Sequence, residues 1–337
     1  MTGSTDITSV EALEAVLGQT PPAMHLKVID HLDTGALAWL SRSPLGFAGF
    51  GSAEGLRVTL AGGAAGFAEG DARTLRIPLA MLDDPALPAI GAPVGALFLL
   101  PGVGETLRVN GRVSGLEDGA VQVEVGECYG HCAKAMIRSR FWDAAAMETP
   151  QEAAPFTDAV RFVALASMSA QGWADLSPKG DPAGGMVQLE RDVLWFADRP
   201  GNRRMDSFRN IIEQPRVALA LLVPGSTSVA RIHGRARITT DPAIRERFAV
   251  QGKVPSLAIG VEIAGLELRE SAALKRAALW PVTPEKSIEP TKLFIAHIKL
   301  NRNRGWAAAL ARASIAVPGM STLMQKGLEK DYKDNLY

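Results

Sequence analysis

Two adjacent arginines are the first residues whose type and spacing suggest chemistry. Arg203 and Arg204 follow a Pro-Gly turn in the stretch FADRPGNRRMDS, residues 196–207, between a strand-like run and a run with helical apolar spacing. This spacing predicts that both arginines lie in the first turn of a helix, where free backbone N–H groups favour an anion. The alternative is that they are solvated surface groups paired with Asp198 and Asp206.

The elements that would position these arginines belong to an internal repeat. Residues 97–113, LFLLPGVGETLRVNGRV, align without gaps to residues 220–236, ALLVPGSTSVARIHGRA. Residues 121–142 align in the same way to residues 259–280. One insertion, residues 241–253, changes the register between the two blocks and is interpreted as an extra helix. The chain is therefore predicted to contain two copies of one domain.

Each copy is predicted to be rich in strands. In the second copy, short runs with alternating or β-branched residues predict the strands 160–168, 173–177, 186–190, 193–197, 217–223, 229–239 and 257–264. Helices are predicted at 203–213, 241–250 and 268–279. Six or seven strands with few helices favour a small barrel in each half. The predicted units are a first domain with N-terminal helices at 1–150, a second domain at 151–285, and a C-terminal helical extension at 286–337.

Composition restricts the possible partners. The 337 residues contain 36 Lys and Arg and 36 Asp and Glu, which gives a formal net charge of +0. This balance gives no support for a nucleic-acid partner. No stretch approaches the ~18 apolar residues that a membrane span needs, and the polar N-terminus resembles no signal peptide. We therefore expect a cytoplasmic protein without a nucleic-acid or membrane partner.

The two cysteines, Cys128 and Cys132, are too few for a disulfide framework. With His131 they form the motif CYGHC, which would place three potential ligands on nearly one face if it were helical. A tetrahedral zinc site needs a fourth ligand, and the sequence has no second Cys/His cluster. We therefore predict no metal site and two reduced, packed thiols; a further role of the cluster stays open.

Several ordered blocks carry a family resemblance. The blocks SPKGDPAGG and DRPGNRRMDSFRNIIEQPRVALALLVPG resemble the pyridoxamine 5′-phosphate oxidase-like family of split-barrel FMN-binding proteins. The blocks PGVGETLRVNGRV and ECYGHCAKAMIRSRFW resemble later blocks of that family. The resemblance covers about residues 20–145 and 156–281. Family members are usually single-barrel homodimers with two flavins at the subunit interface. The resemblance thus implies a mainly β fold with helices (α+β), in which two tandem split β-barrels pack as an intramolecular pseudo-dimer, with a C-terminal helical arm.

The resemblance also implies a phosphate side of the site in the second copy. Arg203 and Arg204 would bind the phosphate bidentately, Lys179 would add a point charge, and Asn202 would cap the helix. The predicted residues on this side are Ser177, Lys179, Phe196, Ala197, Asn202, Arg203, Arg204 and Ser207. The first copy lacks the cations: the positions aligned to Ser177 and Lys179 are Leu60 and Gly62, and the arginine loop aligns to an apolar run around Met81.

The flavin-ring side is implied in the first copy, at Glu105, Arg108, Lys134, Arg138 and Trp142. In the second copy Glu105 is replaced by Ser228 and Lys134 by Ala272. Each copy therefore keeps a different half of one site. Arg138 and Trp142 recur in the second copy as Arg276 and Trp280, which leaves barrel packing as an alternative role for both.

These observations predict one FMN site per chain, at the interface of the two barrels. The predicted activity is that of an FMN-dependent oxidoreductase acting on an unidentified small molecule, with NAD(P)H as a candidate electron donor. No catalytic residue is assigned. A non-catalytic flavin-binding or sensor protein remains an alternative, as does a split barrel that binds haem or deazaflavin instead. Both a monomeric pseudo-dimer and a homodimer are compatible with the sequence.

Overall fold

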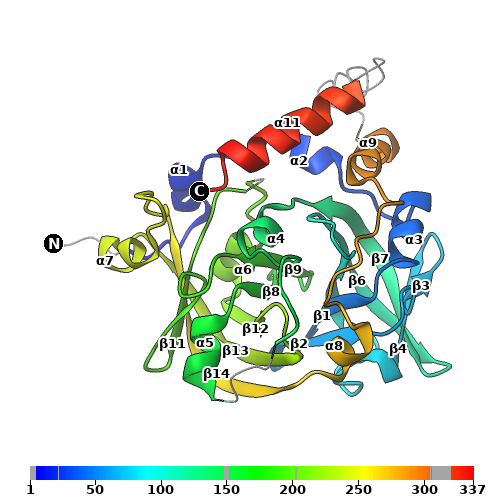
Figure 1. Ribbon diagram of the computed structural model, residues 1–337, viewed down its shortest axis with the longest axis horizontal. Helices are drawn as coiled ribbons and strands as arrows, with labels where there is room; N and C mark the ends of the chain where they lie inside the picture. The colour runs from blue at the N-terminus through cyan, green and yellow to red at the C-terminus, as the bar shows by residue number, and fades with distance from the viewer. Residues whose placement is uncertain (1–4, 22, 148–151, 202, 304, 306–319) are drawn as a thin grey trace.

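The structure is a computed structural model that describes the chain except for residues 1–4, 22, 148–151, 202, 304 and 306–319. Two seven-stranded antiparallel sheets, with helices around them, make up most of the described part (Figure 1). This is the predicted mainly β fold with helices. Neither sheet closes on itself through its end strands.

The first sheet has the strand order β2-β1-β5-β6-β7-β4-β3. Its strands are β1 Leu45–Ser52, β2 Gly55–Gly62, β3 Glu69–Gly70, β4 Thr74–Pro78, β5 Pro93–Leu99, β6 Thr106–Glu117 and β7 Ala120–His131. The second sheet has the order β9-β8-β12-β13-β14-β11-β10. Its strands are β8 Phe162–Met168, β9 Ala174–Gly180, β10 Gln188–Glu190, β11 Val193–Ala197, β12 Arg216–Leu222, β13 Ser228–Thr239 and β14 Ala258–Glu270. Each strand of the second sheet takes the place of the strand seven earlier, so the two copies share one topology.

The helices differ from the sequence predictions at two boundaries. They are α1 Val10–Leu17, α2 Ala23–Leu26, α3 Thr34–Leu40, η1 Leu79–Met81, α4 Lys134–Arg138, α5 Ala153–Ala159, α6 Asp206–Glu213, α7 Pro242–Arg245, η2 Glu246–Phe248, α8 Ala272–Ala277, α9 Pro290–Leu300 and α11 Met320–Asp334. Helix α6 begins at Asp206 rather than at residue 203, because Arg203 and Met205 have φ of 55° and 58°, which an α-helix excludes. The predicted helix 268–279 begins later too, since β14 still pairs with β13 at Glu270.

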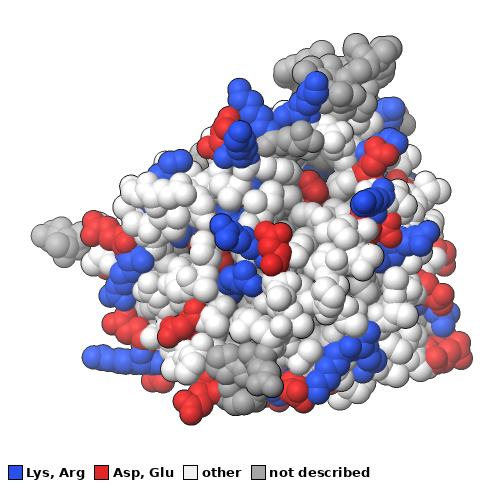
Figure 2. All heavy atoms as spheres, in the orientation of Figure 1, with Lys and Arg blue, Asp and Glu red and all other residues white. Residues whose placement is uncertain are grey.

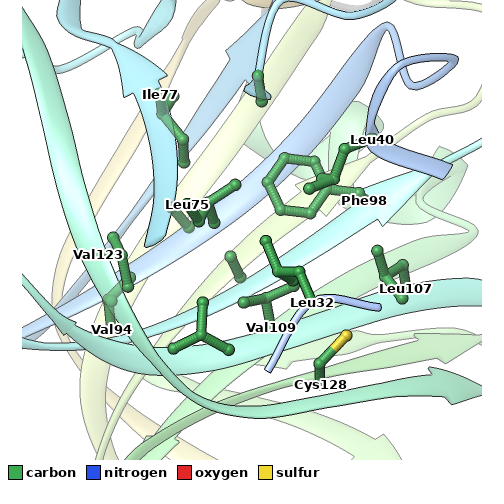
Figure 3. Packing of buried hydrophobic residues seen from close by; sticks show 14 of the residues in the cluster. Leu32, Leu40, Leu75, Ile77, Val94, Phe98, Leu107, Val109, Val123 and Cys128 are labelled. Atoms are coloured by element: carbon green, nitrogen blue, oxygen red, sulfur yellow. The ribbon is translucent and has the colours of Figure 1, made fainter. Parts of the chain in front are cut away.

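Three apolar cores hold the sheets together. The first lies on one face of the first sheet, where Leu107, Val109 and Phe98 converge with Cys128 (Figure 3). The second occupies the equivalent place in the second copy. The third joins the copies and contains Phe47 from β1 beside Phe162 from β8, with ring centroids 5.7 Å apart. The two sheets are thus packed through a shared core, as the predicted pseudo-dimer requires.

The contacts across this core are reciprocal. Helix α4 of the first copy packs on β9 of the second, and α8 of the second packs on β2 of the first. A Cβ on Gly180 would overlap the carbonyl oxygen of Ala135, and a Cβ on Gly62 that of Ala273. The approach explains why both strands end in glycine, since only a residue without Cβ lets the helix backbone come so close. The same contact made in both directions indicates an approximate two-fold relation.

The segments outside the repeat break this symmetry. Helix α11 crosses one edge of the molecule beside α2, with α9 at its far end (Figure 1). Leu13 of α1 lies in the second core, whereas Leu293 of α9 lies in the first. The domain boundaries at 150 and 285 stay predictions. No helix in the described ranges is both long and apolar enough to cross a membrane.

Charge is distributed evenly over the visible face. Basic and acidic side chains are interspersed in Figure 2, without a large area of one sign among the coloured residues. The coloured residues of this face therefore offer no extended positive area for an anion (Figure 2).

Candidate functional site

A cavity of about 610 Å³ lies where the two copies meet. Its walls come from β6 and α4 of the first copy, from β9 and the loop before α6 of the second, and from the C-terminal residues. The basic residues that line it are Arg108, Lys134, Arg138, Lys179, Arg199, Arg203, Arg204 and Lys253. These eight cations face four aspartates, Asp181, Asp198, Asp206 and Asp331. Because positive groups predominate, the cavity favours an anionic ligand.

The arginine loop reaches this cavity in an unusual backbone conformation. Arg203 and Met205 both have positive φ, which costs free energy in residues other than glycine and is typical of functional sites. The hydroxyl of Thr20 donates to the carbonyl oxygen of Arg203 at 2.8 Å and holds the loop from outside. The Arg203 side chain is exposed, whereas Arg204 is buried over the ring of Tyr129. The predicted place in the first helical turn is wrong, but both arginines line the cavity.

Lys179 enters the cavity from the last part of β9. Its Nζ lies 4.6 Å from the ring centroid of Phe208 and 3.8 Å from Oδ1 of Asp198. Burial lowers the pKa of Lys179 and raises that of Asp198. Both shifts reflect the cost of removing charge from water, a cost that a bound dianion would reduce for the lysine.

A buried hydrogen-bond network forms the floor of the cavity. Arg108 of β6 donates to Asp175 at 2.5 Å and to Ser177 at 2.9 Å, both on β9, and to the hydroxyl of Tyr129 at 2.6 Å. Ser207 donates to Ser177 at 2.7 Å. Since Arg108 belongs to the first copy and Asp175 to the second, this network connects the two halves of the chain.

Two arginines of the cavity each have a guanidinium N–H group without a hydrogen-bond partner among the described residues. These groups are Nε of Arg108 and Nη2 of Arg199, and both are buried. Arg199 otherwise pairs with Asp181 at 2.6 Å. Buried donors without partners cost free energy, so an oxygen-rich ligand in the cavity would stabilise this arrangement. The residues present therefore fit a phosphate-bearing group.

The structure brings nine of the thirteen predicted site residues to this cavity. They are Arg108, Lys134, Arg138, Ser177, Lys179, Ala197, Arg203, Arg204 and Ser207. Glu105 lies beside it, in an adjoining pocket. Phe196 points the other way from Ala197, into the second core, because successive strand residues alternate between faces. Asn202 lies outside the described residues.

Trp142 does not line the cavity. Its Nε1 donates to the carbonyl oxygen of Val103 at 2.6 Å, and its ring packs edge-on against Phe141. Trp280, its counterpart, donates to the carbonyl oxygen of Phe141 at 3.2 Å. The recurrence of this tryptophan in both copies thus reflects packing at the seam, which was the alternative left open by the sequence.

The sequence analysis missed Asp175, Tyr129 and Arg199. Asp175 could have been found, because Asp175, Ser177 and Lys179 are spaced by two and so lie on one face of a strand. Tyr129 carries no such signal in the sequence, because only its hydrogen bond with Arg108 in the structure connects it with the cavity.

At the pseudo-symmetric place on the other side of the seam, carboxylates pair with the basic side chains. The strand-pairing registers make Thr59 and Ala61 the counterparts of Ser177 and Lys179, one residue before the predicted Leu60 and Gly62. There Asp84 pairs with Arg231, the counterpart of Arg108, and with Arg269 at 2.8 Å. The predicted absence of a cation at the aligned β2 positions agrees with this pairing register, and the carboxylates disfavour an anion.

Cys128, His131 and Cys132 do not share a face. Residues 120–131 form a strand rather than a helix, so Cys128 points into the first core (Figure 3). Burial raises the pKa of its thiol. His131 and Cys132 instead line the cavity. No group of three or more potential metal ligands occurs in the part of the chain that the structure describes.

Residues 149–287 match the family model of pyridoxamine 5′-phosphate oxidase. The second half of the chain is therefore similar to this family. The match contains the arginine loop, β9 and the whole second sheet, and the predicted resemblance is confirmed for this half. No curated protein matches the chain.

Solved structures similar to the chain each cover about one copy of the family domain. HupZ of Group A Streptococcus is 16% identical over 35% of this chain and 93% of its own, with a TM-score of 0.29. General Stress Protein 26 from Bacillus anthracis is 16% identical over 33% and 89%, with a TM-score of 0.26. An F420 reductase is 16% identical over 35% and 98%, with a TM-score of 0.27. Similarity at this level carries no argument about function.

Proposed function

We propose that the chain is an FMN-binding flavoprotein that binds one flavin in the cavity at the seam. The observation that supports this most is that cations from both copies line one cavity, whereas at the pseudo-symmetric place Arg231 and Arg269 are paired with Asp84. A phosphate monoester carries nearly two negative charges, which suits Lys179 and Arg203 at one part of this cavity. Ser177 and Ser207 would add hydroxyl donors.

The residues of the first copy would act on the rest of the cofactor. A bound flavin supplies hydride chemistry that no side chain of the cavity can supply. Arg108, Lys134 and Arg138 are all buried, and positive charge in a medium of low polarity stabilises an anionic ligand more than it would in water. They would therefore raise the reduction potential of a flavin bound beside them. We propose an oxidoreductase that takes electrons from NAD(P)H and acts on a small molecule.

The visible absorption spectrum of the purified full chain tests the cofactor. We expect the two-band spectrum of an oxidised flavin and one FMN released per chain on denaturation. Two flavins per chain would contradict the single site. A Soret band would indicate haem, for which His131 is the only histidine among the cavity-lining residues, and a deazaflavin spectrum would favour that alternative. Bleaching by NADH or NADPH without oxygen would separate an enzyme from a passive flavin binder.

Arg138 and Arg276 offer a matched pair for testing the ring side of the site. Nε of Arg138 donates to the carbonyl oxygen of Gly180 at 3.0 Å, and Nε of Arg276 to that of Gly62 at 2.8 Å. Both variants lose this carbonyl contact, but Arg276 is exposed, whereas Arg138 is buried and also donates to the carbonyl oxygens of Pro200 and Leu336. Arg138→Ala should therefore lower the free energy of unfolding by about 2–3 kcal/mol and Arg276→Ala by about 1 kcal/mol. Only Arg138→Ala should weaken FMN binding, by about tenfold. Equal FMN affinity in both variants would reduce Arg138 to a packing role.

A further inference from the structure

A second pocket, of about 280 Å³, adjoins the cation-lined cavity. His131, Cys132, Lys134 and Arg203 line both spaces, so the two are adjacent. A molecule in the smaller pocket would therefore lie next to a ligand in the larger one.

The smaller pocket is built largely by segments that have no counterpart in the repeat. Met24 comes from α2, Phe294 from α9, and Leu328 and Tyr332 from α11. These three helices gather along one edge of the molecule (Figure 1). Asp331 of α11 also lines the cation-lined cavity, whereas at the pseudo-symmetric place Asp83 and Asp84 pair with Ser271 and Arg269. The terminal helices thus lie on the same side of the seam as the cation-lined cavity.

Several polar groups of this pocket already have partners. Lys134 pairs with Asp331 at 2.9 Å, and the hydroxyl of Tyr332 donates to Glu105 at 3.0 Å. Nζ of Lys27 donates to the carbonyl oxygen of Gly130 at 2.8 Å, and burial lowers the pKa of Lys27 to about 8. Burial also raises the pKa of Glu105. The remaining lining from α2, α9 and α11 is mostly apolar, with Met24, Phe294 and Leu328.

We infer that this pocket is the substrate subsite and takes an uncharged, mostly apolar ring compound with one hydrogen-bonding group. The inference rests on the proposed function, because it treats the larger cavity as the place of the flavin. Its size suits a molecule of one or two fused rings, and Glu105 with Tyr332 supplies the polar contact. Helices α9 and α11 then have a role, since they complete the walls that select the substrate.

Binding of 2-naphthol to the purified full chain, measured by calorimetry, tests this inference. For a ligand of this size we expect a dissociation constant of ~100 µM. Leu328→Trp on α11 should fill the pocket and weaken binding at least tenfold, whereas Lys326→Trp, at an exposed position of the same helix, should leave it within twofold. Thr291→Trp and Lys292→Trp form a second matched pair on α9, so that displacement of α11 in one variant cannot decide the outcome.

Three results would overturn the subsite. The first is no binding of 2-naphthol, and the second is equal binding by the pocket-filling and control variants. The third is tighter binding of 2-naphthoate than of 2-naphthol, abolished by the pocket-filling variants, because this would show that the pocket binds anions. The titration is performed on FMN-loaded and FMN-stripped protein. A chain that binds 2-naphthol in this pocket but no flavin would refute the proposed function alone, and a chain that binds flavin but fails the pocket test would refute the subsite alone.

Discussion

A variant that lacks both Lys179 and Arg203 is expected to purify without flavin. The two side chains approach the cavity from β9 and from the loop before α6. Each charge-assisted hydrogen bond to a phosphate contributes about 1.5–3 kcal/mol. Loss of both should weaken FMN binding ~10²- to ~10⁴-fold, and the measured flavin content should fall from about one per chain to less than ~0.1.

The control for this variant removes two cations elsewhere. Arg247 and Lys275 form exposed ion pairs with Glu190 and Glu270, far in sequence from the arginine loop. The double change to alanine there alters the net charge equally, and should cost little stability because exposed pairs contribute about 0–1 kcal/mol. A Lys179→Ala/Arg203→Ala protein that keeps one FMN per chain, like this control, would refute the phosphate assignment.

The repeat made much of the fold predictable. The gap-free alignment of residues 121–142 with 259–280 predicted correctly that the two segments would form equivalent elements, which are β7 with α4 and β14 with α8. The alignment also indicated which residues serve packing, because a residue that recurs in both copies is not specific to the one proposed binding site. Arg276 makes the same carbonyl contact as Arg138, and Trp280 likewise donates to a carbonyl oxygen of the seam, as Trp142 does.

Errors arose where tertiary contacts override the local pattern. The helical spacing that starts near residue 203 is interrupted by left-handed conformations at Arg203 and Met205, which side-chain periodicity cannot reveal. The loose alignment of β2 with β9 was shifted by one residue, and such a shift moves every side chain to the other face of the strand. The CYGHC motif does not meet the condition of a helix under which its three ligands would share a face, since β7 continues to His131 through its pairing with β6.

The terminal segments could not be placed from the sequence at all. Their helices were predictable, but the surface that they cover was not, because it is formed by both copies together. Glu105 shows the consequence: the sequence assigned it to the flavin wall, whereas it accepts a hydrogen bond from Tyr332 of α11 in the adjoining pocket.

Arg108→Met is expected to cause the largest loss of stability among these variants. Arg108 is 1% exposed, and its removal would leave the carboxylate of Asp175, which is 5% exposed, without its cation. Breaking a buried ion pair on one side costs about 3–5 kcal/mol. Arg231→Met, at the pseudo-symmetric position, should cost only about 1 kcal/mol. There Asp84 keeps Arg269 as a partner and both Asp84 and Glu267 reach solvent.

The pH dependence of this variant gives the prediction a second readout. Without Arg108, the buried carboxylate of Asp175 would be uncompensated, and burial disfavours its charged form. Stability then falls as pH rises, and the deficit of Arg108→Met relative to the unaltered chain should be larger at pH ~7 than at pH ~5. Chemical unfolding at both pH values measures this difference, and Arg108→Met/Asp175→Asn should remove it. A pH-independent deficit, or one matched by Arg231→Met, would mean that the arginine stabilises the seam by packing rather than by neutralising a buried carboxylate.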